Sequence, residues 1–258
     1  NKLTPMMKQY LEVKNRYKDC ILFFRLGDFY EMFFEDALVA SKALEIALTG
    51  KACGLEERAP MCGVPFHSAN SYISKLVENG YKVAIGEQME DPSTAKGIVR
   101  REVIRVITPG TVLDGNLLEN KKNNYLLSLY KDGTNIGLTY VDISTGETNA
   151  TCLNEDKVIE EIAKIHPTEI IINDLDFIEK LRDIATVSNI YINESFSDNY
   201  LDINILKEYF PDVYLQKLKF DDKGLIKSSL SILLNDIYNT QKQITSNINN
   251  INIYNSSE

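Results

Sequence analysis

The sequence is short of the residues that build metal, redox and nucleotide sites. It has two histidines and four cysteines, and no two cysteines stand in a Cys-x-x-Cys spacing. A zinc site needs closely spaced Cys and His ligands, so we expect none. Irregularly spaced cysteines are typical of reduced thiols in a cytoplasmic protein. The phosphate loop Gly-x-x-x-x-Gly-Lys-Ser/Thr is also absent, so we expect neither an ATPase nor a nucleotide cofactor in this chain.

Long apolar segments are missing as well. No apolar run approaches the roughly 18 residues of a membrane-spanning helix, so we expect no membrane partner. The first residues lack a charged leader followed by an apolar core, and we therefore expect no signal peptide. With 44% hydrophobic and 25% charged residues, the 258-residue chain is typical of a globular protein and long enough for two domains.

An excess of positive charge, on which duplex-DNA binding depends, is also absent. The net charge is −9 and is unevenly distributed. Residues 1–115 carry 15 Lys and Arg against 15 Asp and Glu, whereas residues 116–258 carry 13 against 22. The first part is therefore neutral, and phosphate would repel the second. We expect weak duplex affinity from this chain by itself, with strong binding supplied by segments that it does not contain.

Helix and strand signals alternate in the first part of the chain. Thr4 followed by Pro5 is an N-cap with proline at the first helical position, so a helix should begin there. The pattern predicts helices over residues 4–17, 27–44 and 69–79, and strands over 20–26, 46–49, 60–66, 82–88 and 100–108. These signals indicate a mixed-sheet α/β domain over residues 1–113.

A polar, turn-rich linker is predicted over residues 114–124. Hairpin turn chemistry then separates three strands, and helices and strands alternate afterwards. The pattern predicts strands over 125–130, 136–143, 147–153, 169–172 and 190–192, helices over 155–165 and 176–184, and a long closing helix around 226–237. Three antiparallel strands followed by βα units describe an RNase-H-like α/β domain over residues 125–245. The Asn-rich residues 246–258 are expected to form a tail leading to a further domain.

The segment around Gly27 is the most informative one. An apolar run ends there, and Phe29 follows two residues before Glu31. Gly27 can take backbone angles that other residues avoid, which would place both side chains at the surface. An exposed aromatic beside a hydrogen-bond acceptor suits insertion into a base stack, where the aromatic unstacks one step and the acceptor contacts the displaced base. The alternative is a helix that buries Phe29 on its i, i+3, i+4 face, and the pattern alone favours it.

Four segments carry a resemblance to a known family. They are Thr4-Pro5-Met6-Met7-Lys8-Gln9-Tyr10, Phe24-Arg25-Leu26-Gly27-Asp28-Phe29-Tyr30-Glu31, Met61-Cys62-Gly63-Val64-Pro65-Phe66-His67 and Val106-Ile107-Thr108-Pro109-Gly110-Thr111. In this order they closely resemble the N-terminal part of the MutS family of bacterial DNA mismatch-repair proteins. The resemblance covers essentially the whole chain, densely to about Thr111 and loosely afterwards. Four motifs in register are specific, whereas any one alone would be weak.

The resemblance implies roles for individual residues. In the family the Phe of the Phe-x-Glu element stacks on a mispaired base and the Glu hydrogen-bonds it, and these roles fall on Phe29 and Glu31. A contact with the DNA backbone falls on Arg101. Leu26 and Tyr30 flank the wedge and are expected to shape it by packing. The RNase-H-like domain corresponds to the connector domain of the family.

Four more residues are candidates for phosphate contacts on local grounds. Lys96 stands in a glycine-flanked loop that can approach a phosphate closely, and the alternative is an ordinary surface lysine. His67, Ser68 and Asn70 stand at the start of a predicted helix, where free N–H groups and the positive end of the helix dipole favour a phosphate. The alternative there is simple capping of the helix by Ser68.

Two other functions stay open. The first is a metal-dependent nuclease, because RNase-H-like nucleases hold metal ions between carboxylates, and Asp142 is a candidate ligand with Glu147 and Asp174 as partners. Asp142 comes late in its strand, however, before a turn where Asp is common, and nothing in the spacing requires the three carboxylates to meet. The second is an interaction scaffold whose acidic connector domain docks a partner protein.

For the whole family protein the resemblance implies ATP and Mg²⁺ as cofactors and a homodimer as the assembly. It implies two partners, mismatched double-stranded DNA and a MutL-type repair protein that binds the connector domain. It also implies a bacterial cytoplasmic location associated with the nucleoid. The dimer contacts and the DNA-clamping domains are expected beyond residue 258.

Overall fold

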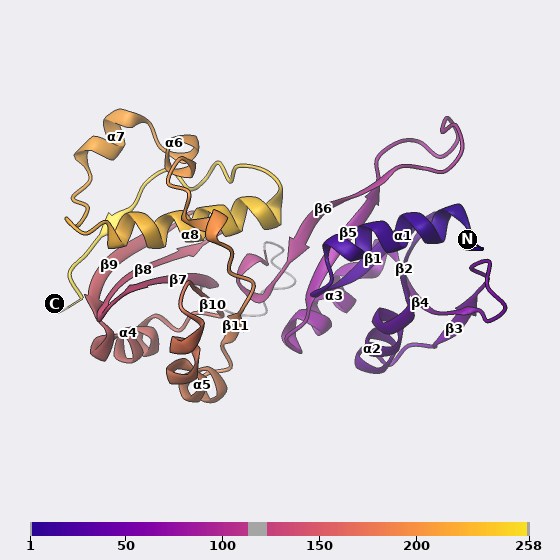
Figure 1. The fold of residues 1–258 in the computed structure, drawn as a ribbon, viewed down its shortest axis with the longest axis horizontal. Coiled ribbons are helices and arrows are strands. Elements are labelled where there is room, and N and C mark those ends of the chain that lie inside the picture. Colours follow the sequence, from indigo (N-terminus) through magenta and orange to yellow (C-terminus); the bar gives the residue numbers. More distant parts are fainter. Residues whose placement is uncertain (1, 113–122, 257–258) are drawn as a thin grey trace. The chain divides into compact units, whose positions relative to one another are not determined.

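The computed structural model describes residues 2–112 and 123–256 of the chain. They divide into two compact units, and the division falls between Thr108 and Pro109. Each unit contains its own six-stranded sheet (Figure 1). Most of the predicted linker, residues 114–124, lies outside the described residues.

The first unit is a mixed sheet with helices on both faces (Figure 1). Its elements are α1 (Pro5–Arg16), β1 (Cys20–Leu26), β2 (Phe29–Phe33), α2 (Phe34–Leu44), β3 (Thr49–Lys51), β4 (Ala59–Pro65), a 3-10 turn (Phe66–Ser68), α3 (Ala69–Glu78), β5 (Lys82–Gln88) and β6 (Arg101–Ile107). The strand order is β3-β4-β2-β1-β5-β6, in which β1 and β5 are parallel and the other neighbours antiparallel. The predicted mixed-sheet α/β fold is therefore confirmed.

Helix α1 covers one face of this sheet. It begins as the sequence predicts, because the Thr4 side chain accepts a hydrogen bond from the Met7 backbone N–H and Pro5 occupies the first helical position. Its buried side chains pack on the strand residues beneath, and the Tyr10 hydroxyl donates to the Phe33 carbonyl at 3.2 Å. This anchoring fixes the sheet face that carries the candidate site.

The predicted continuous helix from Gly27 to Leu44 is wrong in its first part. Phe29–Phe33 is strand β2, and the helix begins only at Phe34. A two-residue turn joins β1 to β2, with Gly27 at a φ of 59°, which suits glycine at the first position of a type II′ hairpin turn. In strand β2, Tyr30, Met32 and Phe33 are buried and Phe29 is exposed. Because Phe29 is apolar although exposed, the polar–apolar alternation that would mark a strand is hidden in the sequence.

The second unit has the strand order expected of an RNase-H-like fold. Its elements are β7 (Tyr125–Asp132), β8 (Asn135–Asp142), β9 (Thr148–Asn154), α4 (Val158–Ile165), β10 (Glu169–Ile172), α5 (Ile178–Val187), β11 (Tyr191–Asn193), α6 (Ile205–Tyr209), α7 (Asp212–Lys217), α8 (Leu225–Gln241) and β12 (Asn252–Ile253). The order is β11-β10-β7-β8-β9-β12, with β7, β8 and β9 antiparallel and β10 and β11 parallel to β7. The predicted architecture is confirmed.

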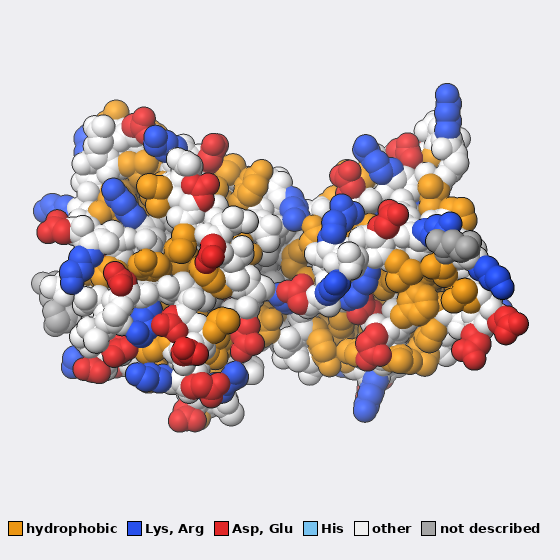
Figure 2. All heavy atoms as spheres, in the orientation of Figure 1, with side chains coloured by type: hydrophobic (Ala, Val, Ile, Leu, Met, Phe, Trp, Pro, Cys, Tyr) orange, Lys and Arg blue, Asp and Glu red, His pale blue; other side chains and the backbone are white. Residues whose placement is uncertain are grey.

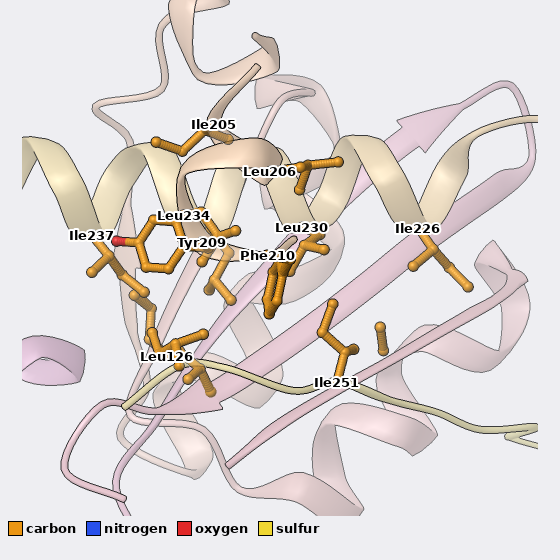
Figure 3. Close-up of a cluster of buried hydrophobic side chains, with 14 of the residues drawn as sticks. Leu126, Ile205, Leu206, Tyr209, Phe210, Ile226, Leu230, Leu234, Ile237 and Ile251 are labelled. Carbon is orange, nitrogen blue, oxygen red and sulfur yellow. The ribbon is translucent and has the colours of Figure 1, made fainter. Parts of the chain in front are cut away.

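Helix α8 crosses one face of this second sheet, and α4 and α5 cover the other (Figure 1). Apolar side chains of α8 and α6 meet the sheet in one buried cluster, in which Leu230, Leu234 and Phe210 are central (Figure 3). Residues 246–253, expected to be a tail, also contribute, because Ile251 is buried in this cluster and β12 pairs with β9. No described helix is long and apolar enough to cross a membrane.

Candidate nucleic-acid interface

Phe29 is the exposed tip of the β1–β2 hairpin. It is the first residue of β2 and is 46% exposed, although its strand neighbours Tyr30 and Met32 are buried. Leu26 pairs with it across the turn and is half-buried. The segment after β4 also fixes the turn, because the Phe66 backbone N–H donates to the Asp28 carbonyl at 2.8 Å. The Phe29 ring is thus exposed beside a turn that hydrogen bonds hold in place.

Glu31 lies on the same face of β2 as Phe29, because side chains two residues apart on a strand point the same way. Opposite it on β4 stands Gly63. A Cβ at Gly63 would lie 3.5 Å from the Glu31 Cγ and 3.9 Å from the Phe29 Cδ1. A larger residue there would crowd both side chains. Because Gly63 has no side chain, the Phe29 ring and the Glu31 side chain lie next to each other above the backbone of β4.

Lys51 holds the Glu31 carboxylate, a contact that the sequence analysis missed. Its Nζ lies 2.9 Å from Glu31 Oε1, and the side chains are 34% and 14% exposed. The ammonium also lies 5.9 Å from the centre of the buried Phe33 ring. Residues 31 and 51 meet only because β4 pairs with both β2 and β3. Local sequence patterns therefore do not predict the contact between Lys51 and Glu31.

Arg101, expected to contact the DNA backbone, is buried within the unit. Its Nη1 donates to Gln9 Oε1 and its Nε to the Arg25 carbonyl, both at 2.7 Å. The guanidinium also lies 5.0 Å from the centre of the Phe24 ring. Desolvation lowers the pKa of Arg101, and the charge of Glu31 opposes that shift. Arg101 thus lies on the same sheet face as Glu31, beside Phe24, where it ties α1 and β1 to β6.

Tyr30 supports the hairpin from the opposite face. Its hydroxyl donates to Glu87 Oε2 at 2.7 Å, and Arg25 pairs with Glu87 Oε1 at 3.0 Å. Burial raises the pKa of Tyr30, with the Glu87 hydrogen bond adding to the effect. The Arg25 guanidinium also stacks on the Phe66 ring, 3.7 Å from its centre. This network joins β1, β2 and β5 directly behind the turn.

The predicted phosphate residues at the start of α3 lie close to the hairpin in the fold. Pro65 pairs with Phe29 across β2 and β4, and His67 and Ser68 follow it in an exposed 3-10 turn. Asn70 is also exposed. The Ser68 hydroxyl donates to the Pro65 carbonyl at 3.4 Å and makes no capping bond to α3. The capping alternative for Ser68 is therefore not seen.

Lys96 stands in a loop that leaves the sheet at the same end as the hairpin, because β1 and β5 are parallel and in register. It is exposed in the loop between β5 and β6, which projects beyond the sheet (Figure 1). Gly97 beside it has a φ of 85°, a conformation that favours glycine. The loop is braced by Asp91, whose carboxylate accepts from the Ser93 backbone N–H at 2.9 Å. That bond lowers the pKa of Asp91.

The candidate nuclease residues of the second unit do not form a metal site. Asp142 is buried at the end of β8, and its Oδ1 accepts from the Ser144 N–H and hydroxyl at 3.0 and 2.6 Å. Glu147 accepts from the Tyr125 hydroxyl, and Asp174 caps a 3-10 turn. Within residues 2–112 and 123–256, no three His, Cys, Asp or Glu side chains gather as metal ligands would. Asp142 is used in building its turn.

Comparison with known proteins assigns both units. Residues 4–116 match the family described as MutS domain I, and residues 124–252 match MutS domain II. The chain belongs to the MutS family. The DNA mismatch repair proteins MutS of Acetivibrio thermocellus and Alkaliphilus oremlandii are each 52% identical to it, and the alignments cover 98% of the chain and 30% of those proteins. The MutS protein of Clostridium botulinum strain 657 is also 52% identical, with 27% of its length covered. This MutS-family chain thus spans under a third of these relatives.

Proposed function

We propose that this chain is the mismatch-sensing part of a MutS-type repair protein, with Phe29 as the wedge and Glu31 as the base-contacting acceptor. The observation that carries the proposal is the exposed ring of Phe29 at the tip of a braced hairpin, with the Glu31 carboxylate beside it. Hydrophobic side chains also gather over β2 and β4 on the face seen in Figure 2. The family membership supports the same role.

Phe29 enters from the minor groove and partly unstacks one base step. Unstacking costs on the order of a few kcal/mol per step, and a mispair is already weakly stacked. Entry therefore costs less at a mispair or a small loop than between Watson–Crick pairs. The difference is a test of how easily the duplex deforms, and it needs no contact with a particular base sequence.

Glu31 adds a second test. Its carboxylate accepts a hydrogen bond from the displaced base, which offsets the cost of bringing a negative charge into a negative groove. An intact duplex keeps its bases stacked and presents no displaced base to donate to Glu31, so the same charge opposes binding there. Glu31 thus favours mispaired DNA and also penalises paired DNA.

The surrounding polar residues position the duplex. His67, Ser68 and Asn70 lie beside the hairpin, where they can contact the phosphates that flank the wedge. Lys96 contacts the backbone farther along the duplex from its projecting loop. Arg101 supports this face from within the fold, and it would have to leave Gln9 and the Arg25 carbonyl to reach a phosphate itself.

The remaining properties belong to the whole protein. We place ATP and Mg²⁺ binding and dimer formation in the parts of the relatives that this chain does not span, so the chain itself is not an ATPase. The second unit links the sensor to those parts and docks a MutL-type partner. The cytoplasmic, nucleoid-associated location follows from binding chromosomal DNA.

Substitution of Phe29 by Ala in the full-length protein tests the proposal. Base–aromatic stacking contributes about 1–3 kcal/mol, so we expect the ratio of mispaired to paired affinity to fall roughly 10- to 100-fold. The measurement is fluorescence anisotropy with two duplexes that differ by one mispair. Leu38→Ala is a matched control, because Leu38 on α2 is 44% exposed and lies outside the hairpin. Unchanged discrimination in Phe29→Ala would disprove the wedge role.

A further inference from the structure

Glu31 interacts with one cation from each edge strand of the sheet, and only one of them contacts it directly. Lys51 approaches from the edge strand β3 and forms the direct ion pair. Arg101 approaches from the other edge strand, β6, and interacts with Glu31 through its charge alone. Because Arg101 uses its hydrogen bonds on Gln9, Arg25 and Val99, Lys51 is the cation that fixes the position of the carboxylate.

The Lys51 contact uses one carboxylate oxygen. Among the described residues, the hydrogen bond to Glu31 reaches Oε1, and Oε2 keeps its capacity to accept. Lys51 is itself restrained, because β3 is paired with β4 and the ammonium lies near the Phe33 ring. The Glu31 carboxylate is therefore oriented before DNA binds. It lies beside Phe29, and its Oε2 can accept a further hydrogen bond.

We propose that Lys51 is a positioning and specificity-determining residue that pre-orients Glu31 for the mispaired base. This inference rests on the proposed function and adds a residue to it. Without Lys51, the partly buried carboxylate has lost its partner and turns toward water. It must then be ordered again at a mispair, which weakens mispair binding. At a paired duplex it can swing away from the phosphates, which reduces the penalty on paired DNA.

Lys51→Met in the full-length protein tests this, since Met keeps the apolar stem over Phe33 and removes the charge. We expect the ratio of mispaired to paired affinity to fall about three- to tenfold, mainly through weaker mispair binding, and Lys51→Arg to retain most of the ratio. Lys75→Met removes an equal charge from an exposed ion pair on α3 and should leave the ratio unchanged. Thermal unfolding verifies that each variant is folded.

A double-mutant cycle separates positioning from simple attraction to phosphate. In a Glu31→Gln background, Lys51→Met should change both affinities by the same factor, because there is no carboxylate left to orient. An equal loss for both duplexes in the wild-type background would overturn the inference and make Lys51 a plain phosphate contact. A ratio that falls as far in the Glu31→Gln background as in the wild type would overturn it as well. Phe29→Ala in the same assay distinguishes failure of this inference from failure of the proposed function. If discrimination between the two duplexes depends on Phe29 but not on Lys51, only the positioning role of Lys51 is rejected.

Discussion

Phe29 is exposed although its aromatic neighbours in the chain are not. Phe23, Phe24 and Phe33 have no exposed surface. Burying a Phe side chain is worth about 1.5–3 kcal/mol, which Phe29 partly forgoes. The sequence motif marks Phe29 and Glu31 as functional through the family resemblance. It gives no sign of Lys51 as the partner of Glu31 or of the burial of Arg101, because both depend on which strands are neighbours.

The four cysteines, predicted to be reduced, differ in accessibility and support a pH-dependent prediction. Burial raises the pKa of Cys20 to about 12 and that of Cys62 to about 11. Desolvation also raises the pKa of Cys152, but its side chain is exposed to reagents and those of Cys20 and Cys62 are not. Iodoacetamide should therefore modify Cys152 first, and raising the pH from 7 to 9 should leave Cys20 and Cys62 protonated and unmodified. Mass spectrometry of the alkylated protein measures this, and Cys152→Ser should remove the fast reaction. Equal early modification of Cys20 would contradict the burial.

At the scale of elements, the pattern located most helices and strands but assigned β2 to a helix. The apolar residues from Phe29 to Ala37 satisfy helical spacing, and β2 begins without polar–apolar alternation because its exposed first residue, Phe29, is itself apolar. The chain changes from strand to helix at Phe34, whose φ of 54° is unusual for a residue other than glycine. That conformation is imposed by the surrounding packing, so local preference could not predict it.

The approach of α8 to β8 depends on a glycine. A Cβ at Gly137 would lie 2.1 Å from the Leu225 carbonyl oxygen, so Gly137→Ala must displace the start of α8. We expect a loss of about 3 kcal/mol in the unfolding free energy of the second unit, at the upper end for overpacking. Urea denaturation measures it. Gly133→Ala is the control, because it meets no atom within 4 Å and adds only the strain of a φ of 61°, about 1 kcal/mol. Equal losses would mean that α8 yields easily.

At the scale of the whole molecule, the charge distribution limits the general affinity of this chain for DNA. Acidic and basic side chains are interspersed on the face seen in Figure 2, and the net charge of the chain is −9. Such a surface gives little general attraction to phosphate. Under the proposed function, the exposed ring and carboxylate of the hairpin therefore probe the duplex and contribute little to general affinity for it.

The central claim is that Phe29 enters the duplex at a mispair, and photo-crosslinking tests it most directly. p-Benzoylphenylalanine replaces Phe29 in the full-length protein, and the crosslinked nucleotide is mapped on a duplex with one mispair. We predict a crosslink at the mispaired base or its immediate neighbour, lost on the fully paired duplex and absent when the same group replaces Leu38. Crosslinks spread evenly along both duplexes, or none from position 29, would contradict the role of Phe29 as the probe.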